Sequence, residues 1–436
     1  MSTSRIEGKT ETLPCASLSP NPEPPKCLIL TLVCTYLPGY KAGGPIRSIA
    51  NLVAAVGREF DFRIVTLDRD FGEKLPYPGI VTNRWVRVGH ADVMYLRPGL
   101  RGLLGEWALL RSVDENTVLY LNSFFARRSS MLAVLMRWLN LCRPRCLVLA
   151  PRGEFSLGAL QFKHTRKRLY IGIARWLGLY DGLIWQASSE FEAVDIKRQF
   201  PEAMNVNAAS AIPDAHMGRK IVEISCVAEA SDLLRADPEA RLGPLRRKVP
   251  GELRVVFISR ISRSKNLTGA LRLLAGVSGD VSFDMYGPAE DVAYWEECQD
   301  LIAALPANIK ARYGGQLAHE RVGQVLAEHD LFLLPTFGEN FGHVISEALT
   351  AGCPALISDK TPWRNLEAEG VGWDIPLSET ERFRTILQQC VDGNDEWHAA
   401  LSTRARAYAA VRASDPISVD ANRRLFQQAF GWRGPC

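Results

Sequence analysis

The sequence has no long hydrophobic run and no strong excess of charge of one sign. Its best candidate for a membrane span, residues 131–150, is interrupted by Arg137, Arg143 and Arg145. Charges inside a bilayer are costly, so we expect no transmembrane helix. Fifty-two Lys and Arg residues against 48 Asp and Glu give a formal charge of +4. That value excludes the concentrated positive field of a dedicated nucleic-acid-binding protein, and no nucleic-acid partner is expected.

The ten cysteines form no C-x-x-C pair and have no histidine at zinc-ligand spacing. We interpret them as reduced thiols of a cytosolic protein, and we expect no metal site. Cys142 and Cys146 can share a helix face. Two ligands without a third are more typical of core residues.

The composition is that of a globular protein, with 47% hydrophobic and 23% charged residues in a chain of 436. This length predicts two domains of roughly 200 residues each. Residues 1–26 are rich in Ser, Thr, Pro and Glu, and this composition predicts a disordered tail. The apolar run 27–34 has no small-residue cleavage site after it, so it is better interpreted as a buried strand than as a signal peptide.

Short apolar runs alternate with helix-length segments, which predicts an α/β fold with parallel sheets. The expected strands are 28–35, 62–66, 117–121, 146–150 and 182–186 in the first half, then 253–259, 282–286, 309–313, 331–335 and 355–358 in the second. Two Rossmann-like, doubly wound domains that face a central cleft would hold a ligand at the carboxyl ends of their strands. The predicted organisation is an N-terminal domain at 27–210, a linker at 211–250, a C-terminal domain at 251–412, and a final helix within 413–436 that returns to the N-terminal domain.

The segment Pro335–Ser358 is predicted to form a strand, a turn, a helix and a second strand. Glycines in the turn allow close backbone approach. The amides of Phe341, Gly342 and His343 are then expected at a helix N-terminus, which favours an anion such as a diphosphate.

Two carboxylates flank that turn. Glu339 precedes the helix and Glu347 is on its second turn. Because carboxylates repel phosphate, they are better suited to accept hydrogen bonds from sugar hydroxyls. The alternative is an acidic helix start, which the helix dipole also favours.

Arg260 and Lys265 follow a predicted strand and precede a helix. Arg can chelate two phosphate oxygens and Lys supplies a mobile point charge. Arg263 competes for either role. Basic residues at a strand end are also common on ordinary surfaces.

In the first half, the turn Gly43–Gly44 after the first strand lets backbone amides approach a phosphate, with Arg47 in the following helix. A plain loop is the alternative. Arg152 and Glu154, at the end of another strand, are candidates for contact with the acceptor. The alternative is that they pair with each other.

The spacing Glu339-x7-Glu347 lies inside G-E-N-F-G-H-x-x-x-E-A-L-x-x-G-x-P, downstream of Arg260 and Lys265. With this pattern the chain resembles a family 4 glycosyltransferase of the GT-B fold, over nearly all of residues 28–432. The segment G-G-P-I-R-S, the segment P-R-G-E and the T-P-W loop at 361–363 resemble a bacterial branch that builds exopolysaccharides and surface polysaccharides.

The resemblance implies that Arg260 and Lys265 bind the donor diphosphate and stabilise the leaving group. It further implies that Glu347 holds the ribose hydroxyls and that Glu339 holds a hydroxyl of the transferred sugar. The amides of residues 341–343 would contact the sugar and the diphosphate.

The resemblance also implies that Gly44 completes the cradle from the other domain. Transfer would retain the anomeric configuration without a metal or other cofactor, because cations and a helix terminus supply the positive charge. The acidic pair Asp68 and Asp70 is therefore not interpreted as a metal motif. Many family members have a histidine in the first-domain loop near the reacting sugar. Here Arg152 lies in that segment, while His90 and His164 lie elsewhere.

A basic stripe in the first half is suited to anionic lipid or a lipid-diphosphate acceptor, although a solvated helix face explains it as well. Its members are Arg127, Arg128, Lys163, His164, Arg166, Lys167 and Arg168. The predicted function is transfer of a hexose or similar sugar from a nucleotide-diphosphate sugar to a glycan or lipid-linked acceptor, in the cytoplasm or at the inner face of the membrane. The alternatives are a GT-B sugar-nucleotide epimerase and a catalytically silent binding module for glycans or nucleotides.

Overall fold

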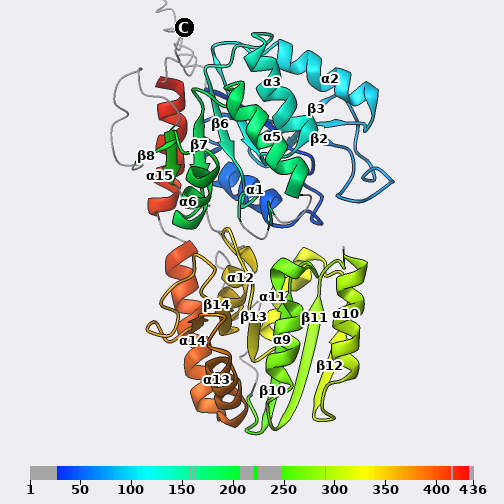
Figure 1. Ribbon diagram of the computed structural model, residues 1–436, viewed down its shortest axis with the longest axis vertical. Coiled ribbons are helices and arrows are strands. Elements are labelled where there is room, and N and C mark those ends of the chain that lie inside the picture. Colours follow the sequence, from blue (N-terminus) through cyan, green and yellow to red (C-terminus); the bar gives the residue numbers. More distant parts are fainter. Residues whose placement is uncertain are drawn as a thin grey trace, which may run out of the picture.

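The computed structural model describes residues 27–156, 159–160, 164–206, 220–223, 247–289, 291–413 and 416–431. Figure 1 shows two lobes, one above the other, with the N-terminal half of the chain in the upper lobe and the C-terminal half in the lower one. The predicted tail at 1–26 lies outside the described residues.

The upper lobe contains a nine-stranded sheet with the order β3-β4-β2-β1-β5-β6-β7-β9-β8. Strand β3 runs antiparallel to β4, and the other pairs are parallel. The strands are β1 (Leu28–Leu32), β2 (Asp61–Leu67), β3 (Trp85–Val88), β4 (Ala91–Leu96), β5 (Thr117–Asn122), β6 (Cys146–Ala150), β7 (Ile184–Ala187), β8 (Met204–Val206) and β9 (Lys220–Glu223).

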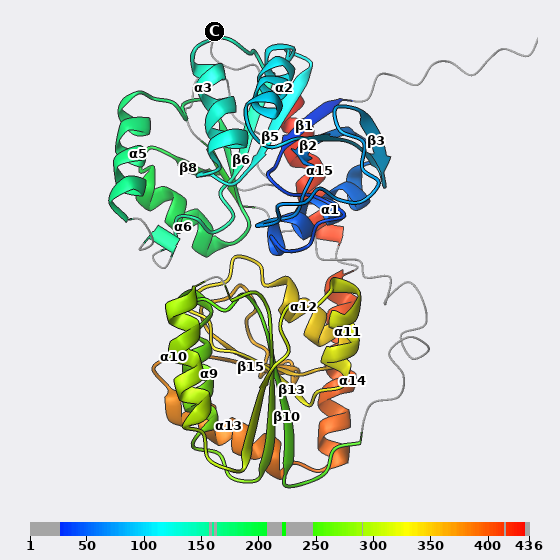
Figure 2. The same cartoon turned by 90° about the vertical axis from the view of Figure 1, so that its right-hand side faces the viewer.

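Helices cover both faces of this sheet (Figures 1 and 2). One face packs against α1 (Gly44–Val56) and α15 (Pro416–Gly431), which contribute Ile49 and Phe426 to a shared core. The other face packs against α2 (Leu100–Arg111), the π-helical turn η1 (Arg127–Met131), α3 (Leu132–Trp138), α5 (His164–Trp176) and α6 (Glu190–Gln199). The chain therefore returns to the upper lobe in its last described helix.

The lower lobe contains a six-stranded parallel sheet with the order β12-β11-β10-β13-β14-β15. Its strands are β10 (Glu252–Ile258), β11 (Asp280–Tyr286), β12 (Ile309–Tyr313), β13 (Leu331–Leu334), β14 (Ala355–Ser358) and β15 (Gly372–Ile375). The helical elements are η2 (Arg263–Lys265), α9 (Leu267–Leu274), α10 (Val292–Ala303), α11 (His319–Ala327), α12 (His343–Ala351), α13 (Thr380–Asp392) and α14 (Asp395–Ala413).

Each of the ten predicted strands is present, with ends that shift by a few residues. The sequence patterns did not predict β3, β4, β8 and β15, and β9 falls in the expected linker. The linker prediction is wrong at Lys220–Glu223, because β9 pairs with β7 and β8 inside the first sheet. Strand β3 is largely exposed at the sheet edge, so it lacks the apolar run that marks a buried strand.

The suggestion that Cys142 and Cys146 share a helix face is also wrong. Helix α3 ends at Trp138, Cys142 lies in the loop that follows, and Cys146 begins β6. Both side chains are buried. They are core residues, which was the alternative. Among the helices of the described residues, none combines the length and the apolar character needed to cross a bilayer.

Candidate functional site

The predicted site residues of the lower lobe meet where its sheet changes direction. Strands β10 and β13 are neighbours, yet the chain winds from β10 toward β11 on one side and from β13 toward β14 on the other. In open α/β sheets, such a switch point leaves a crevice at the carboxyl ends of the two strands, where ligands bind. Arg260 and Lys265 follow β10, and Glu339 follows β13.

Lys265 and Glu339 form an ion pair at this crevice. The Lys265 Nζ lies 2.6 Å from the Glu339 Oε1, and it also donates to the Gly338 carbonyl at 3.3 Å. Their side chains are only 12% and 14% exposed. Water screens such a partly enclosed pair less than it screens a surface pair. The pair places one cation and one carboxylate beside the sheet edge.

Hydrogen bonds to backbone carbonyls hold the two loops of the crevice together. The Asn266 side chain donates to the Pro335 carbonyl at 2.8 Å, and the Phe337 amide donates to the Ser264 carbonyl at 2.9 Å. The Thr336 hydroxyl donates to the Ser264 carbonyl at 3.0 Å. The position of Lys265 is therefore fixed relative to Glu339 by the backbone, in addition to the ion pair.

Helix α12 begins beside the same loop. Gly342 precedes it in the left-handed conformation, with φ 78° and ψ 59°, and a Cβ at this position would lie 2.7 Å from Ile345. The Trp363 indole donates to the Phe341 carbonyl at 2.6 Å, so the T-P-W loop supports the turn. The first amides of α12 lie at the positive end of the helix dipole, which favours an anion.

Glu347 is one turn further along α12 and lies beside a residue that sequence analysis missed. Its Oε1 is 3.7 Å from the Nδ1 of His319, the first residue of α11. The structure therefore gives the two predicted carboxylates different neighbours, Lys265 for Glu339 and His319 for Glu347. A lone histidine at a helix start carries no motif, so the sequence offered no signal for it.

The structure separates the three cations that follow β10. Arg260 is exposed at the carboxyl edge of the sheet. Arg263, its competitor, turns toward α10, with its Nη1 2.9 Å from the Glu297 Oε2 and its guanidinium 5.0 Å from the centre of the Tyr294 ring. Arg263 is thus paired with another element, whereas Lys265 is paired inside the crevice.

The upper lobe contributes the turn at Gly43–Gly44. Gly43 precedes α1 with φ 68°, and α1 starts at Gly44. Asp70 supports the preceding loop, because its carboxylate accepts from the amides of Tyr40 at 2.9 Å and Lys41 at 3.2 Å. The acidic segment at 68–70 therefore has a structural use within the chain.

The two lobes meet at α1 and α12. The Ser48 Oγ lies 3.0 Å from the His343 Nε2, and a Cβ on Gly44 would lie 3.6 Å from the His343 ring. The predicted turn and the predicted helix start therefore face each other across the lobes. Arg47 is next to Ser48 on the same helix and is half-buried.

Arg152 and Glu154 do not pair with each other. Arg152 donates to the Asn122 Oδ1 at 3.0 Å and to the Tyr120 hydroxyl at 2.7 Å. Glu154 accepts from the Ser123 hydroxyl at 2.6 Å, and from the amides of Phe124 at 2.5 Å and Phe125 at 2.9 Å. Burial raises the pKa of the Glu154 carboxyl above its ordinary value, against these hydrogen bonds, which lower it.

Gly153 brings this loop to the interface of the lobes. A Cβ on Gly153 would lie 3.4 Å from the Asn340 Cβ of the lower lobe. The Gly153 amide donates to the Glu192 Oε1 at 2.6 Å, and the other Glu192 oxygen accepts from the Ser188 amide and hydroxyl. Glu192 is therefore a positioning residue that sequence analysis missed, because an acidic residue in the first turn of a helix is common.

The predicted basic stripe is not one continuous outward face. The Arg128 Nε turns inward to the Glu106 Oε2 at 2.6 Å. Lys167 donates to the Ala159 carbonyl and lies 4.8 Å from the centre of the Phe125 ring. Lys163 and the His164 side chain lie outside the described part of the chain.

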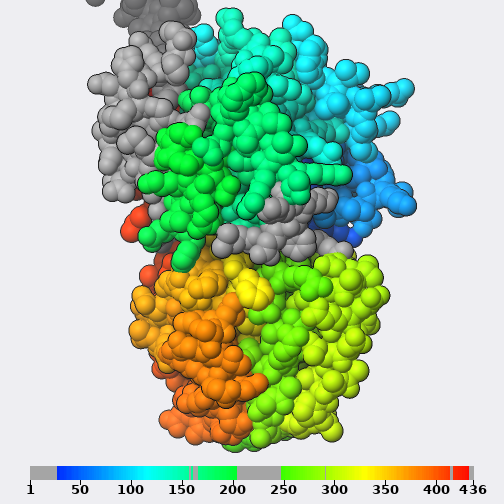
Figure 3. Space-filling model, viewed as in Figure 1, coloured from blue at the N-terminus to red at the C-terminus, as the bar shows by residue number. Residues whose placement is uncertain are grey.

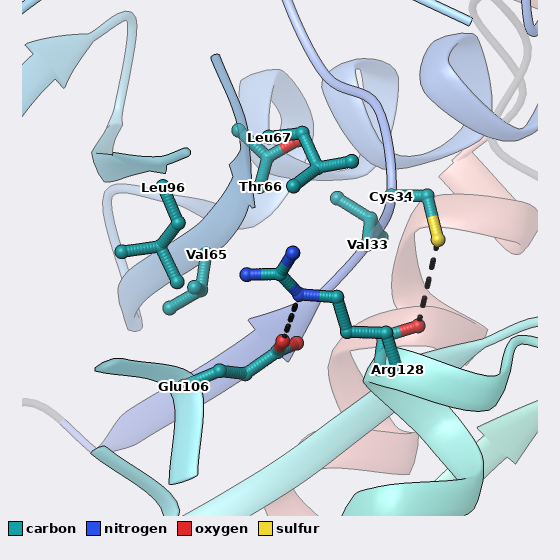
Figure 4. Close-up of a pocket in the computed structure, with 9 residues that line it drawn as sticks. Val33, Cys34, Val65, Thr66, Leu67, Leu96, Glu106 and Arg128 are labelled. Carbon is teal, nitrogen blue, oxygen red and sulfur yellow. Dashed lines mark hydrogen bonds and ion pairs between the residues drawn. The ribbon is translucent and has the colours of Figure 1, made fainter. Parts of the chain in front are cut away.

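Figure 4 shows that Glu106 and Arg128 line a cavity with Cys34 at the ends of β1, β2 and β4. Its volume of about 10 Å³ suits about one water molecule. Burial raises the pKa of the Glu106 carboxyl, although Arg128 acts in the opposite direction.

Residues 246–407 match the family described as "Glycosyl transferases group 1". This match supports a glycosyltransferase. The matched region includes both carboxylates and both cations of the crevice. A stretch of 115 residues is also 30% identical to the 2-deoxystreptamine N-acetyl-D-glucosaminyltransferase of Niallia circulans. This similarity spans 26% of the chain and 29% of that relative.

Solved glycosyltransferase structures resemble most of the chain. HepE of Anabaena, in complex with UDP and glucose, has a TM-score of 0.58 at 17% identity, over 92% of this chain and 99% of HepE. Sucrose-phosphate synthase of Thermosynechococcus elongatus has a TM-score of 0.61 at 14% identity, over 93% and 99%. At these identities the likeness shows the fold alone. It confirms the predicted GT-B architecture of two Rossmann-like domains.

Proposed function

We propose that the protein transfers a sugar from a nucleotide-diphosphate sugar to a glycan or a lipid-linked acceptor, with retention of the anomeric configuration, as a family 4 enzyme of surface polysaccharide or exopolysaccharide synthesis. The observation that carries the proposal is the Lys265–Glu339 pair, which is held at the switch point of the lower sheet. Close to it, α12 points its N-terminus at the α1 turn of the other lobe.

In this proposal the donor diphosphate lies between Arg260, Lys265 and the first amides of α12. Negative charge grows on the diphosphate as the glycosidic bond breaks, and fixed cations and dipoles that face it stabilise the transition state. Lys265 exchanges part of its contact with Glu339 for a phosphate oxygen. The released Glu339 carboxylate then accepts a hydrogen bond from a hydroxyl of the transferred sugar. The proposed reaction uses no metal and no further cofactor.

Glu347 is assigned to the ribose of the nucleotide. Its carboxylate is 20% exposed, and a carboxylate accepts two hydroxyl donors well. UDP is the first nucleotide to test, since HepE is described in complex with UDP and glucose. The proposed compartment is the cytoplasm, where free thiols such as Cys34 persist.

The acceptor is assigned to the upper lobe, beside the loop of Arg152, Gly153 and Glu154 and near Arg47. Gly153 approaches Asn340, so the loop forms a wall opposite the donor crevice. Because the Glu154 carboxylate is occupied by Ser123 and two amides, it positions this wall and is not free to bind substrate. The family histidine is absent from this segment. Because the Arg152 side chain donates to Asn122 and Tyr120, it positions the loop, and the loop backbone faces the reacting sugar.

The proposal is tested by thermal unfolding with UDP, GDP or ADP in the presence of a chelator. A ligand at about 100 times its Kd adds roughly 2.7 kcal/mol to the free energy of unfolding. We expect one nucleotide to raise the Tm, and we expect Arg260→Ala or Lys265→Ala to abolish that rise. Arg263→Ala is the matched control, because Arg263 is held by α10.

A product assay separates the alternatives. Incubation with the matching nucleotide sugar and an acceptor is expected to give a glycoside with the donor's anomeric configuration by NMR. Release of free nucleotide without a glycoside would favour the epimerase. Absence of both a Tm rise and a product would leave the silent binding module.

A further inference from the structure

Three neighbouring helices of the upper lobe, and the turn that follows α3, expose large apolar side chains to solvent. We call these residues the α2–α3–α5 surface. Its eleven members are Leu100, Leu103, Leu104, Trp107, Leu135, Trp138, Leu139, Leu141, Leu169, Ile173 and Trp176. Each is at least 36% exposed, and together they are 11 of the 25 exposed large apolar residues in the described part of the chain. Such a concentration marks an interaction site, since single exposed apolar residues are usually scattered.

The exposed residues follow helical spacing. On α2, Leu100, Leu104 and Trp107 recur at i, i+4 and i+7, and the first two are 79% and 65% exposed. On α5, Leu169 and Trp176 are 64% and 84% exposed, at positions i and i+7. Residues with this spacing share one face of a helix. Other faces of these helices already pack in the core. The outward-facing apolar residues therefore do not contribute to the packing of the core.

Side-chain contacts connect the helices into one surface. The Trp138 indole of α3 donates to the Leu177 carbonyl just after α5, at 3.0 Å. Arg128 of η1 pairs with Glu106 of α2. In Figures 1 and 3, α3 and α5 lie side by side on the face of the upper lobe turned toward the viewer, and α2 follows along the same lobe.

The charge of these helices is one-sided. Residues 100–111, 127–138 and 164–176 contain nine Lys and Arg and one acidic residue, Glu106, whereas the whole chain carries only +4. Glu106 is buried and paired with Arg128. Arg166, Arg168 and Arg175 are exposed among the apolar residues of α5.

At the start of α2, Arg97 and Arg101 line a surface groove of about 230 Å³ together with Thr82, Asn83 and Gly102. Both arginines are exposed and lie beside Leu100. Positive charge therefore continues along this edge of the surface.

We propose that the α2–α3–α5 surface docks on an anionic lipid bilayer. Trp and Leu insert at the boundary between headgroups and acyl chains, while Arg pairs with anionic headgroups. A second copy of this chain fits poorly, since a two-fold interface places the same positive surface on both sides. This docking does not depend on the proposed glycosyl transfer, although it would bring a lipid-linked acceptor within reach.

The test is co-sedimentation of the full chain with vesicles of phosphatidylcholine, with and without about 30% phosphatidylglycerol. We expect binding only to the anionic vesicles and a steep loss with added salt. Leu104→Ser combined with Leu169→Ser and Trp176→Ser is expected to weaken binding tenfold or more. The matched control is Val411→Ser with Ile417→Ser, whose side chains are 71% and 73% exposed outside the surface.

A charge variant separates the two contributions. Arg166→Gln with Arg168→Gln is expected to weaken binding to anionic vesicles several-fold and to reduce its salt dependence. Arg247→Gln, at a side chain that is 88% exposed in the other lobe, is expected to change neither. Circular dichroism checks that each variant is folded.

Three results would overturn the inference. They are no binding to anionic vesicles, equal loss in the matched control, and a dimer in light scattering that the Leu104, Leu169 and Trp176 substitutions dissociate. The nucleotide-dependent rise in Tm is expected to persist in the surface variants. A failed vesicle assay with an intact nucleotide response therefore removes the docking surface and leaves the proposed function standing.

Discussion

The two lobes are both α/β layers around a parallel sheet, yet their outer helices differ. In the upper lobe, α2, α3 and α5 carry apolar residues on both their inner and outer faces. In the described residues of the lower sheet domain, exposed large apolar side chains are few and scattered, such as Val292, Phe337 and Val411. The distinctive feature of the lower lobe is instead the ion pair between Lys265 and Glu339 at the edge of its sheet. One fold therefore supports two kinds of specialisation, a crevice in one domain and a surface in the other.

The largest expected effect is on the free energy of unfolding. It compares a buried tryptophan with an exposed tryptophan of the upper lobe. Trp185 is fully buried among Phe124, Tyr180 and Phe200. We expect Trp185→Ala to lower the free energy of unfolding by about 3–5 kcal/mol, because it leaves a cavity. Trp176→Ala, at 84% exposure, is expected to change it by less than about 0.5 kcal/mol. Urea unfolding measures both, and equal losses would show that Trp176 belongs to the core.

The next effect concerns the crevice of the lower lobe. Arg260→Ala and Lys265→Ala are each expected to lower the transfer rate by about 10²–10³-fold, because each removes a fixed charge from the developing negative charge of the leaving group. Arg263→Ala is expected to stay within about twofold, since its guanidinium is held by Glu297 and Tyr294. Steady-state kinetics, with the donor identified by thermal unfolding, measures the transfer rate of each variant. A loss in Arg263→Ala equal to that in Lys265→Ala would contradict the assignment.

A smaller effect is expected at the contact between the lobes. Ser48→Ala removes the hydrogen bond to His343, and a hydrogen bond of this kind contributes about 0.5–1.5 kcal/mol. We expect the KM for the donor to rise roughly two- to tenfold while the fold is retained. Ser112→Ala is the control, because the Ser112 hydroxyl bonds only locally, to the Leu109 carbonyl. An unchanged KM in Ser48→Ala would show that this contact has no part in donor binding.

The last effect appears only at alkaline pH, and both lobes share it. Burial raises the pKa of Cys146 in the upper lobe and of Cys390 in the lower lobe from 9.0 to about 12. Between pH 9 and 12 the unfolded chain has released these protons and the folded chain still holds them, so the free energy of unfolding falls as pH rises. The slope is roughly 1 kcal/mol per pH unit for each thiol.

Denaturant titrations at several alkaline pH values measure that slope. Cys146→Ala with Cys390→Ala is expected to flatten it, even though the variant starts from a lower stability. Cys27→Ala serves as the control, because Cys27 is exposed. A slope that stays the same in the double variant would assign the pH dependence to other groups.

Much of the architecture follows from local patterns. Each of the ten expected strands is present because runs such as residues 253–259 are short, apolar and bounded by turns. The same reasoning missed β3 and β9, which are short and lie in the outer parts of the first sheet. Their pairing partners, rather than their own composition, keep them extended.

The outer helices show where periodicity stops being informative. A stripe such as Leu100, Leu104 and Trp107 has the spacing of a core face, and the sequence contains a second stripe on the same helix. Which of the two stripes is buried depends on which face of the helix packs against the sheet. The predicted basic stripe is divided for the same reason, since Arg128 and Lys167 turn toward neighbouring elements while Arg166 and Arg168 are exposed.

The sequence by itself determined the fold class and the strand–turn–helix order at the lower crevice, because hydrophobic periodicity and glycine-bounded turns are local properties of the chain. The spacing of one motif predicted that Glu339 lies at the start of α12, and the strand signal at 253–259 predicted that Lys265 follows a strand end. Only the tertiary structure decided that Lys265 rather than Arg263 faces Glu339, that Arg152 and Glu154 bond to different partners, that His319 lies beside Glu347, and that α2, α3 and α5 expose their second apolar stripe. These outcomes depend on contacts between residues far apart in the chain, and no local pattern encodes which side of a helix or loop its neighbours will occupy.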